Sequence, residues 1–140
     1  MNIALGNDHA GLKLKNKLVA YLEKEGYTVI DCGTYSEESC DYPDYAHAVA
    51  KTMKTGDANR GIVICGSGNG INMAVNKHDH IRSALCWLPE LAELAVQHNN
   101  ANVLALPARF IDETTALNCL KAFLKEKFEG GRHERRVNKI

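Results

Sequence analysis

A cysteine followed by three glycines at alternate positions is the part of this sequence best suited to chemistry. Cys65 ends a short apolar run, and Gly66, Gly68 and Gly70 come directly after it. Glycines at this spacing let the backbone turn sharply and bring its N–H groups close to a negative charge. The helix expected next would direct its positive N-terminal end at the same place. This arrangement suits a reaction in which a proton leaves carbon and negative charge collects on oxygen.

Two plainer interpretations of this stretch stay open. The glycines match neither the Gly-x-Gly-x-x-Gly fingerprint of dinucleotide sites nor a phosphate loop, which needs a following Lys-Ser or Lys-Thr. They are also compatible with a tight strand-to-helix turn that binds nothing. Free cysteines are among the most buried residue types and usually only pack. The position of Cys65 beside the glycines is what makes it a candidate.

Asp8, His9 and Tyr42 form a second group of candidates. Asp8 and His9 follow the first apolar run, so they would face Cys65 if the two strands are neighbours. Asp8 can instead cap the first helix, and His9 can be an ordinary surface histidine. Tyr42 lies at the end of the polar segment 32–42, where it can contact a ligand or pack on its own helix.

The last third of the chain adds basic and amide side chains. Arg132 and Arg136 are four residues apart, so on a helical turn they share a face and can grip one phosphate. Arg109, after the fifth expected strand, is a further cation at the ligand edge of the sheet. A solvated basic tail is the alternative for Arg132 and Arg136. A helix C-terminal cap is the alternative for His98 and Asn99.

Composition limits the class of protein. The 140 residues are enough for one domain with a substantial core, so we expect residues 1–140 to form a single domain. Acidic and basic residues balance at 17 each, so we expect neither nucleic acid nor membrane as a partner. No apolar run of transmembrane length and no leader segment is visible. The five scattered cysteines favour a reducing cytoplasm over disulfides or a zinc site.

The elements that must position these residues alternate along the chain. Strands are expected at 2–6, 27–31, 61–65, 82–86 and 102–106. Helices are expected at 11–25, 43–55, 69–78, 89–98 and 112–127. Five such units predict an α/β fold with a parallel sheet covered by helices on both faces. The commonest order, 2-1-3-4-5, makes strands one and three neighbours, so Asp8 and Cys65 would share one crevice.

The motifs together resemble the ribose-5-phosphate isomerase B family, which also includes allose-6-phosphate isomerase and the galactose-6-phosphate isomerase subunits. The matching motifs run in order from residue 2 to the C-terminus: Asp8–Gly11, Asp41–Pro43, Gly61–Gly68, Ala74–Lys77, His98–Asn99, Asn102–Leu106 and Gly130–His133. The resemblance implies a Rossmann-like three-layer αβα sandwich and a homodimer or dimer of dimers. It also implies metal-free aldose–ketose isomerisation without a cofactor.

The resemblance also implies a role for each candidate. Cys65 would move a proton between two carbons through an enediolate, and His98 would open the sugar ring. Asp8 would handle a hydroxyl proton, and Ser67 would assist near the oxygens that carry the developing oxyanion. The residues that would hold the oxyanion or enediolate are Gly66, Ser67, Gly68, Asn69, Gly70 and Asn99. The residues that would bind phosphate are His9, Arg109, Arg132 and Arg136, with 128–140 as a C-terminal phosphate-binding tail and Tyr42 in the substrate pocket.

We therefore expect a cytoplasmic enzyme that interconverts ribose 5-phosphate and ribulose 5-phosphate. Isomerisation of a hexose 6-phosphate, of the allose or galactose type, is the alternative within the enzyme class. A non-catalytic sugar-phosphate or flavin-phosphate binding module is the alternative from another class, but such a module needs no Cys65, His98 or Asp8. Trp87 stands where many family members carry smaller or polar residues, so the preferred sugar stays open.

The position of His98 predicts an active site shared between subunits. The fourth expected helix starts at the ligand edge of the sheet and runs towards the opposite edge. His98 lies about ten residues along it, or roughly 15 Å from its start. Proton transfer requires hydrogen-bond reach, so Cys65 and His98 of one chain should not meet on one substrate. We expect a two-fold partner to supply its own His98.

Overall fold

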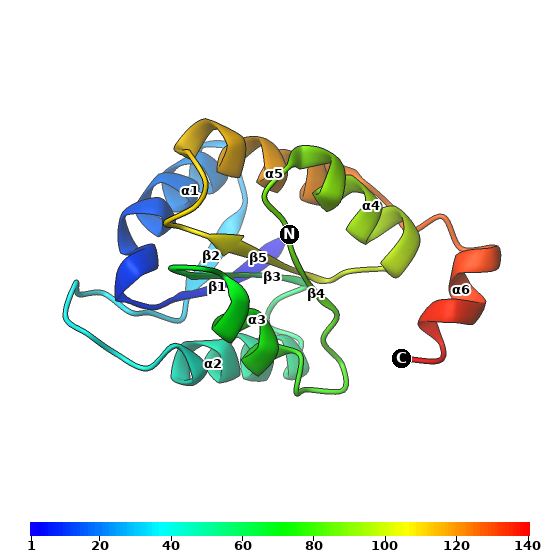
Figure 1. The fold of residues 1–140 in the computed structure, drawn as a ribbon, viewed down its shortest axis with the longest axis horizontal. Helices are drawn as coiled ribbons and strands as arrows, with labels where there is room; N and C mark the ends of the chain where they lie inside the picture. Colours follow the sequence, from blue (N-terminus) through cyan, green and yellow to red (C-terminus); the bar gives the residue numbers. More distant parts are fainter.

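Five parallel strands form the centre of the computed structural model, which describes residues 1–140 (Figure 1). The strands are β1 Asn2–Asn7, β2 Thr28–Asp31, β3 Arg60–Cys65, β4 Ser83–Leu85 and β5 Val103–Pro107. The helices are α1 Leu12–Lys24, α2 Tyr42–Lys54, α3 Asn69–Val75, α4 Pro89–Asn99, α5 Glu113–Lys125 and α6 Arg132–Val137. A 3₁₀ turn, His9–Gly11, precedes α1. None of the helices combines the length and the apolar character needed to cross a membrane.

Helices cover both faces of the sheet, so the predicted three-layer α/β sandwich is confirmed. In Figure 1, α1, α4 and α5 lie above the sheet and α2 and α3 lie below it. Alternation along each strand builds a core on either side. Ile62 and Ile64 of β3 pack with the α1, α4 and α5 layer. Val63 and Cys65 of the same strand pack with the α2 and α3 layer.

The predicted strand order 2-1-3-4-5 is wrong for the last two strands. The observed order is β2-β1-β3-β5-β4, with β5 between β3 and β4. All five residues of β5 are buried, whereas the three residues of β4 are each only partly buried. The longer apolar strand therefore takes the inner position and the short one takes the edge. The predicted contact between β1 and β3 is unaffected, and Asn7 pairs with Ile64 beside Cys65.

This order also explains which face each helix covers. The connections through α1 and α4 run towards the β2 edge, and those through α2 and α3 run towards the β4 edge. Parallel crossovers are right-handed, so connections that run in opposite directions place their helices on opposite faces. Hence α4 packs beside α5, on the same face as α1. In the predicted order, α4 would have joined α2 and α3.

The C-terminal segment contains a helix that was not predicted from the sequence. Helix α6 lies at one end of the molecule and contacts α4 (Figure 1). It contributes no residue to either main core cluster. The face shared by Arg132 and Arg136 nevertheless exists, because both residues belong to this helix.

Candidate active site

The turn after Cys65 requires a glycine at position 68. Cys65 itself is 4% exposed. Gly68 is the N-cap of α3 and has a φ of 73°, in the left-handed region. A Cβ at Gly68 would overlap the Leu85 side chain and lie 3.1 Å from the backbone of Leu106. The glycine spacing therefore reflects a close approach of this turn to its neighbours as well as its backbone conformation.

Tyr42 and Arg109 lie against the same turn from two sides. A Cβ at Gly70 would overlap the Tyr42 ring, so the ring packs directly on that backbone. On the other side, the Arg109 N–H donates to the Gly66 carbonyl at 2.9 Å. A Cβ at Gly66 would come within 3.2 Å of the Arg109 guanidinium nitrogen Nη1. An aromatic ring and a cation thus flank the backbone that follows Cys65.

Asp8 is held at the start of the neighbouring loop. Its Oδ1 accepts hydrogen bonds from the N–H groups of Ala10 at 2.9 Å and Gly11 at 3.2 Å. Its own N–H donates to the carbonyl of Ile64 at 3.0 Å, directly before Cys65. Asp8 is therefore a helix cap, but of the 3₁₀ turn that leads into α1, because the N-cap of α1 itself is Gly11. The same bonds fix the carboxylate next to the end of β3, where it can also act on a ligand.

A groove of about 440 Å³ opens beside Asp8. Its lining residues are Asp8, His9, Cys40, Asp41, Tyr42, Pro43 and Asp44. The Nδ1 of His9 accepts a hydrogen bond from the backbone N–H of Cys40 at 3.3 Å. His9 is thus oriented by the segment that leads into α2. The groove joins the loops after β1 and β2, as expected for the ligand edge of a parallel sheet.

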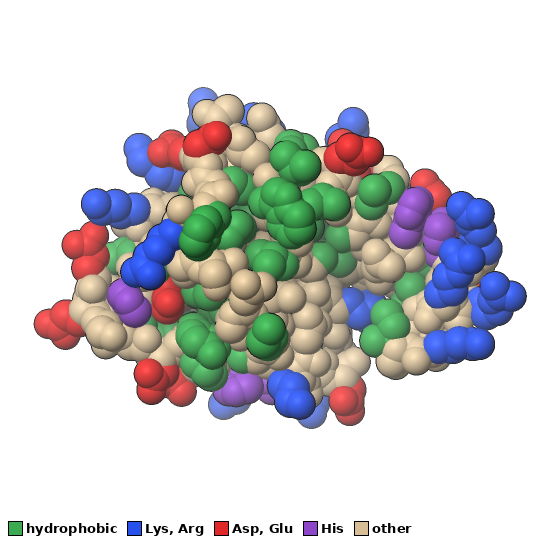
Figure 2. All heavy atoms as spheres, viewed as in Figure 1, with side chains coloured by type: hydrophobic (Ala, Val, Ile, Leu, Met, Phe, Trp, Pro, Cys, Tyr) green, Lys and Arg blue, Asp and Glu red, His purple; other side chains and the backbone are tan.

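Ser67 and Asn69 line a second cavity, of about 370 Å³, with apolar partners. Those partners are Leu85, Trp87, Pro107 and Phe110. Trp87 is 51% exposed and Phe110 is 76% exposed. Figure 2 shows hydrophobic side chains gathered near the segment that joins β4 to α4. Trp87 therefore lies close to the loop that would hold the oxyanion.

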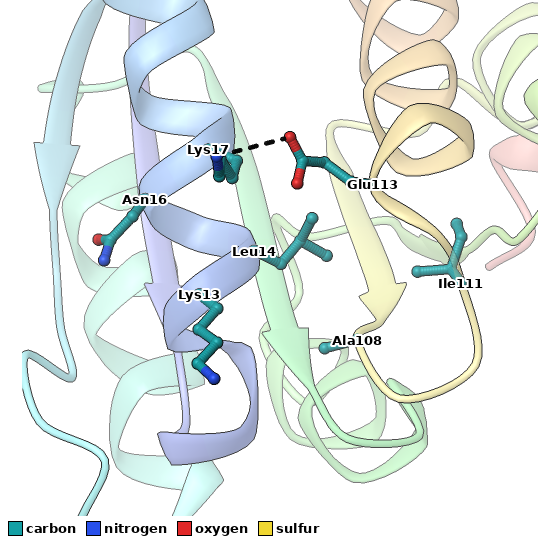
Figure 3. Close-up of a pocket in the computed structure, with 7 residues that line it drawn as sticks. All are labelled: Lys13, Leu14, Asn16, Lys17, Ala108, Ile111 and Glu113. Atoms are coloured by element: carbon teal, nitrogen blue, oxygen red, sulfur yellow. Dashed lines mark ion pairs between the residues drawn. The ribbon is translucent and has the colours of Figure 1, made fainter.

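A third groove, also of about 440 Å³, separates α1 from the segment that leads into α5 (Figure 3). Leu14 and Ile111 are among its apolar lining residues, and Lys17 and Glu113 approach to 4.0 Å across it. None of the predicted site residues lines this groove. Exposed ion pairs of this length contribute little stability. We assign no part of the predicted chemistry to this groove.

His98 and Asn99 lie at the end of the sheet where the strands begin, whereas Cys65 lies at the carboxyl end of β3. They end α4, and Asn99 lines a cavity with residues 81–84 at the start of β4. Helix α6 packs here, so Arg132 and Arg136 belong to the same region. Figure 2 shows Lys, Arg and His side chains gathered at this end of the molecule. One chain therefore brings the predicted residues together as two separate groups.

Glu129 and His133 complete the group around His98. Neither residue was among the candidates predicted from the sequence. The rings of His98 and His133 stack with centroids 4.1 Å apart and planes 10° apart. The Nε2 atoms of His98 and His133 lie 3.9 Å and 3.7 Å from Glu129 Oε2. Burial lowers the pKa of His133, and the neighbouring charges of His98 and Arg132 lower it further. The four-residue spacing of Glu129 and His133 was visible in the sequence, but their contact with His98 was not.

Comparison with known proteins gives consistent results over nearly the whole chain. A family model described as Ribose/Galactose Isomerase matches residues 3–140. Ribose-5-phosphate isomerase B of Escherichia coli is 46% identical over 138 residues, which cover 99% of this chain and 93% of that protein. A probable ribose-5-phosphate isomerase B of Mycoplasma genitalium is 44% identical over 141 residues, which cover 99% and 93%.

Solved structures agree with these sequence matches. A ribose 5-phosphate isomerase of Thermotoga maritima is 48% identical, with a TM-score of 0.96 over 99% of this chain and 95% of that one. Ribose-5-phosphate isomerase B of Mycoplasma genitalium, solved with bound ribulose-5-phosphate, is 44% identical with a TM-score of 0.93. That alignment covers 99% of this chain and 92% of the other.

Proposed function

The chain belongs to the ribose/galactose isomerase family, and on that premise we propose that it interconverts ribose 5-phosphate and ribulose 5-phosphate. Two of the relatives named above are ribose-5-phosphate isomerases B, and one structure carries ribulose-5-phosphate. The reaction moves one hydrogen between neighbouring carbons and leaves the oxidation state of the whole sugar unchanged. It therefore needs an acid–base group and a stabilised enediolate, and no cofactor.

The observation that carries this proposal is the position of Cys65 against its turn and Asp8. The thiol ends β3 where the backbone of Gly66–Gly70 turns into α3. Once deprotonated, it takes the proton from C2 of the open sugar and returns it to C1. Negative charge then develops on the sugar oxygen, which the amides of this turn and Ser67 stabilise by preorganised hydrogen bonds. The guanidinium of Arg109 lies beside Gly66 and adds positive charge to the same region.

The remaining residues bind and prepare the substrate. Asp8 relays a hydroxyl proton, and Tyr42 forms one wall of the sugar groove. His98 protonates the ring oxygen during opening, and Asn99 supports the intermediate. His9 and Arg109 bind the phosphate together with Arg132 and Arg136.

These roles require two chains. One group of residues lies at the end of the sheet opposite to Cys65, namely His98, Asn99, Arg132 and Arg136. The residues of one subunit therefore cannot all reach the same substrate molecule. We infer a homodimer, or a dimer of such dimers, in which a partner supplies its His98 group. The enzyme would act in the cytoplasm on a free sugar phosphate.

A hexose 6-phosphate is the alternative substrate, because the family also includes galactose isomerases. Trp87 beside Ser67 and Asn69 favours the smaller pentose, since an indole ring narrows the space next to the turn. Assays with ribose 5-phosphate and allose 6-phosphate at equal concentrations decide between them. Faster turnover of the hexose would contradict the proposed substrate.

The mechanism is tested by Cys65→Ala with Cys119→Ala as a matched control. Cys119 is a fully buried thiol in α5, away from the turn. Cys65→Ala should bind ribose 5-phosphate almost normally and stop exchange of its C2 hydrogen with solvent deuterium, because the base is missing. Cys119→Ala should retain the exchange. Exchange at a near-normal rate in Cys65→Ala would remove the thiol from this role, and no exchange in the wild type would support a binding module.

A further inference from the structure

Three potential metal ligands meet at the end of α4. They are one ring nitrogen of His98, a carboxylate oxygen of Glu129 and one ring nitrogen of His133, and all three atoms lie within 4.8 Å of one another. They come from three different segments: the last turn of α4, the loop after α5, and α6. Two imidazoles and one carboxylate are a ligand set that zinc uses in proteins when the fourth position is open.

The spacing of these atoms is close to what such an ion requires. Ligand atoms bound about 2.1 Å from a tetrahedral ion are about 3.4 Å apart. The two observed nitrogen-to-oxygen distances are 3.9 Å and 3.7 Å. The His98 and His133 rings are stacked, however, so their in-plane lone pairs run parallel and cannot both point at one ion. Binding therefore requires the His98 side chain, which is 37% exposed, to turn out of the stack, and the Glu129 side chain, which is 53% exposed, to rotate towards the ion.

The backbone around the three ligands is already fixed. The N–H of Glu129 donates to the Gln97 carbonyl at 3.0 Å, which ties the loop to the residue before His98. The N–H of His133 donates to the Gly130 carbonyl at 3.0 Å. His133 is only 7% exposed, so its ring has little freedom. Because the backbone and the His133 ring are held before binding, only the His98 and Glu129 side chains lose conformational entropy when the ion arrives.

The charge of the surroundings limits the affinity. Arg132 and Arg136 lie on α6 with His133, and their positive charge opposes a cation. Two carboxylates attract a cation to the same place. They belong to Glu129 and to Glu126, which accepts a hydrogen bond from Gln97. The strength of the site therefore depends on direct bonds to nitrogen and oxygen, which favours Zn²⁺ or Co²⁺ over Mg²⁺ or Ca²⁺.

We propose that His98, Glu129 and His133 form a binding site for one divalent transition-metal ion of the zinc type, and that this ion inhibits the enzyme. The inhibitory part rests on the proposed function, in which His98 protonates the ring oxygen of the sugar. A metal bound to Nε2 occupies the lone pair that this proton transfer needs. Binding itself needs no catalytic activity.

The binding test uses Co²⁺ alone, because its d–d absorption reports tetrahedral coordination by nitrogen and oxygen. Wild-type protein should bind one Co²⁺ per chain and show no thiolate-to-metal charge-transfer band. Glu129→Gln and His133→Gln should each weaken binding at least tenfold. His78→Gln is the matched control, because His78, His47 and His80 form the other histidine cluster of the chain. Unchanged binding in Glu129→Gln and His133→Gln, or a loss in His78→Gln, would overturn the site.

The inhibition test uses Zn²⁺ with ribose 5-phosphate as substrate. Zn²⁺ should inhibit the wild type and His78→Gln alike, and it should inhibit Glu129→Gln at least tenfold less strongly. Stoichiometric binding of Co²⁺ without inhibition by Zn²⁺ would overturn the inhibitory part. Protein without isomerase activity would contradict the proposed function, while the Co²⁺ titration would still decide the metal site.

Discussion

At the scale of single residues, the five cysteines have very different surroundings. Burial raises the pKa of Cys86 to about 12 and that of Cys119 to about 11. Burial also raises the pKa of Cys32. Cys40 is only partly buried, and its sulfur lies 3.8 Å from Nδ1 of His9 in the groove beside Asp8. Cys65, at the end of β3, is 4% exposed. These differences separate Cys86 and Cys119, which pack in the core, from Cys40, which lines a groove.

Iodoacetamide should therefore label Cys40 first in the native protein. At pH 8 the thiolate fraction of a group with a pKa of about 12 is on the order of 0.0001, so Cys86 should stay unlabelled. Cys119 should behave in the same way until the chain is unfolded. Mass spectrometry of the peptides against labelling time measures this order. Equal labelling of Cys40 and Cys119 would mean that the α5 layer opens readily in the native state.

The residue scale is also where prediction from the sequence was most uneven. The neighbourhood of Asp8 and Cys65 was predictable, because Asp8 follows one apolar run, Cys65 ends another, and the two runs become neighbouring strands. The packing of Tyr42 on Gly70 and of Arg109 on Gly66 was not, since it depends on loop conformations that have no periodic pattern. The stack of His98 and His133 depends on a contact between α4 and α6, which local spacing does not encode.

At the scale of elements, replacing a glycine by alanine in the turn into α3 should lower the free energy of unfolding. Gly68 and Gly56 both have positive φ angles, 73° and 84°, but a Cβ at Gly56 would meet no atom within 4 Å. Gly56→Ala should therefore lose about 1 kcal/mol of unfolding free energy, from backbone strain alone. Gly68→Ala should lose about 3 kcal/mol, because overlap with Leu85 is added to the same strain.

Urea unfolding of these two variants measures both losses. Gly68→Ala should also lower isomerase activity, because the turn amides move with the strained residue. Gly56→Ala should keep full activity. Equal losses of stability in the two variants would show that the turn relaxes away from Leu85.

Helix α6 provides a second test at this scale. Arg132→Ala or Arg136→Ala should weaken binding of ribose 5-phosphate by about 2 kcal/mol, since each guanidinium can form charge-assisted hydrogen bonds to a phosphate. Binding of unphosphorylated ribose should barely change. Isothermal titration with the two sugars separates these effects. Similar losses for both sugars would assign the arginines to the fold or to the subunit interface.

Element type was predictable here, whereas strand order was not. Apolar runs and helical spacing located five strands and five helices near their observed positions. They could not show that β5 enters between β3 and β4, because both late strands are apolar and the difference lies in length and burial. Helix α6 was missed as an element because it has six residues and follows two glycines.

At the scale of the whole molecule, the proposal that each active site is shared between two chains can be tested by mixing two inactive variants. Cys65→Ala and His98→Ala are unfolded together at equal ratio and refolded. In a mixed dimer with shared sites, one site receives both defects and the other receives none. Random pairing should then restore roughly a quarter of wild-type sites.

The control for this experiment is each variant refolded alone, which should stay inactive. Mass spectrometry under native conditions counts the mixed dimers. If mixed dimers form and no activity returns, Cys65 and His98 of the same chain act together, and the shared site is wrong.

The placement of His98 at the far edge of the sheet also has a consequence for how the catalyst behaves on dilution. A site assembled from two chains exists only as long as the chains stay associated, so the number of working sites follows mass action. Activity per milligram would then be constant at high protein concentration and would fall once the concentration drops below the dissociation constant of the dimer. Substrate that binds to both chains would stabilise the dimer and oppose that fall. At low protein concentration the number of working sites would therefore depend most strongly on the concentration of the sugar phosphate.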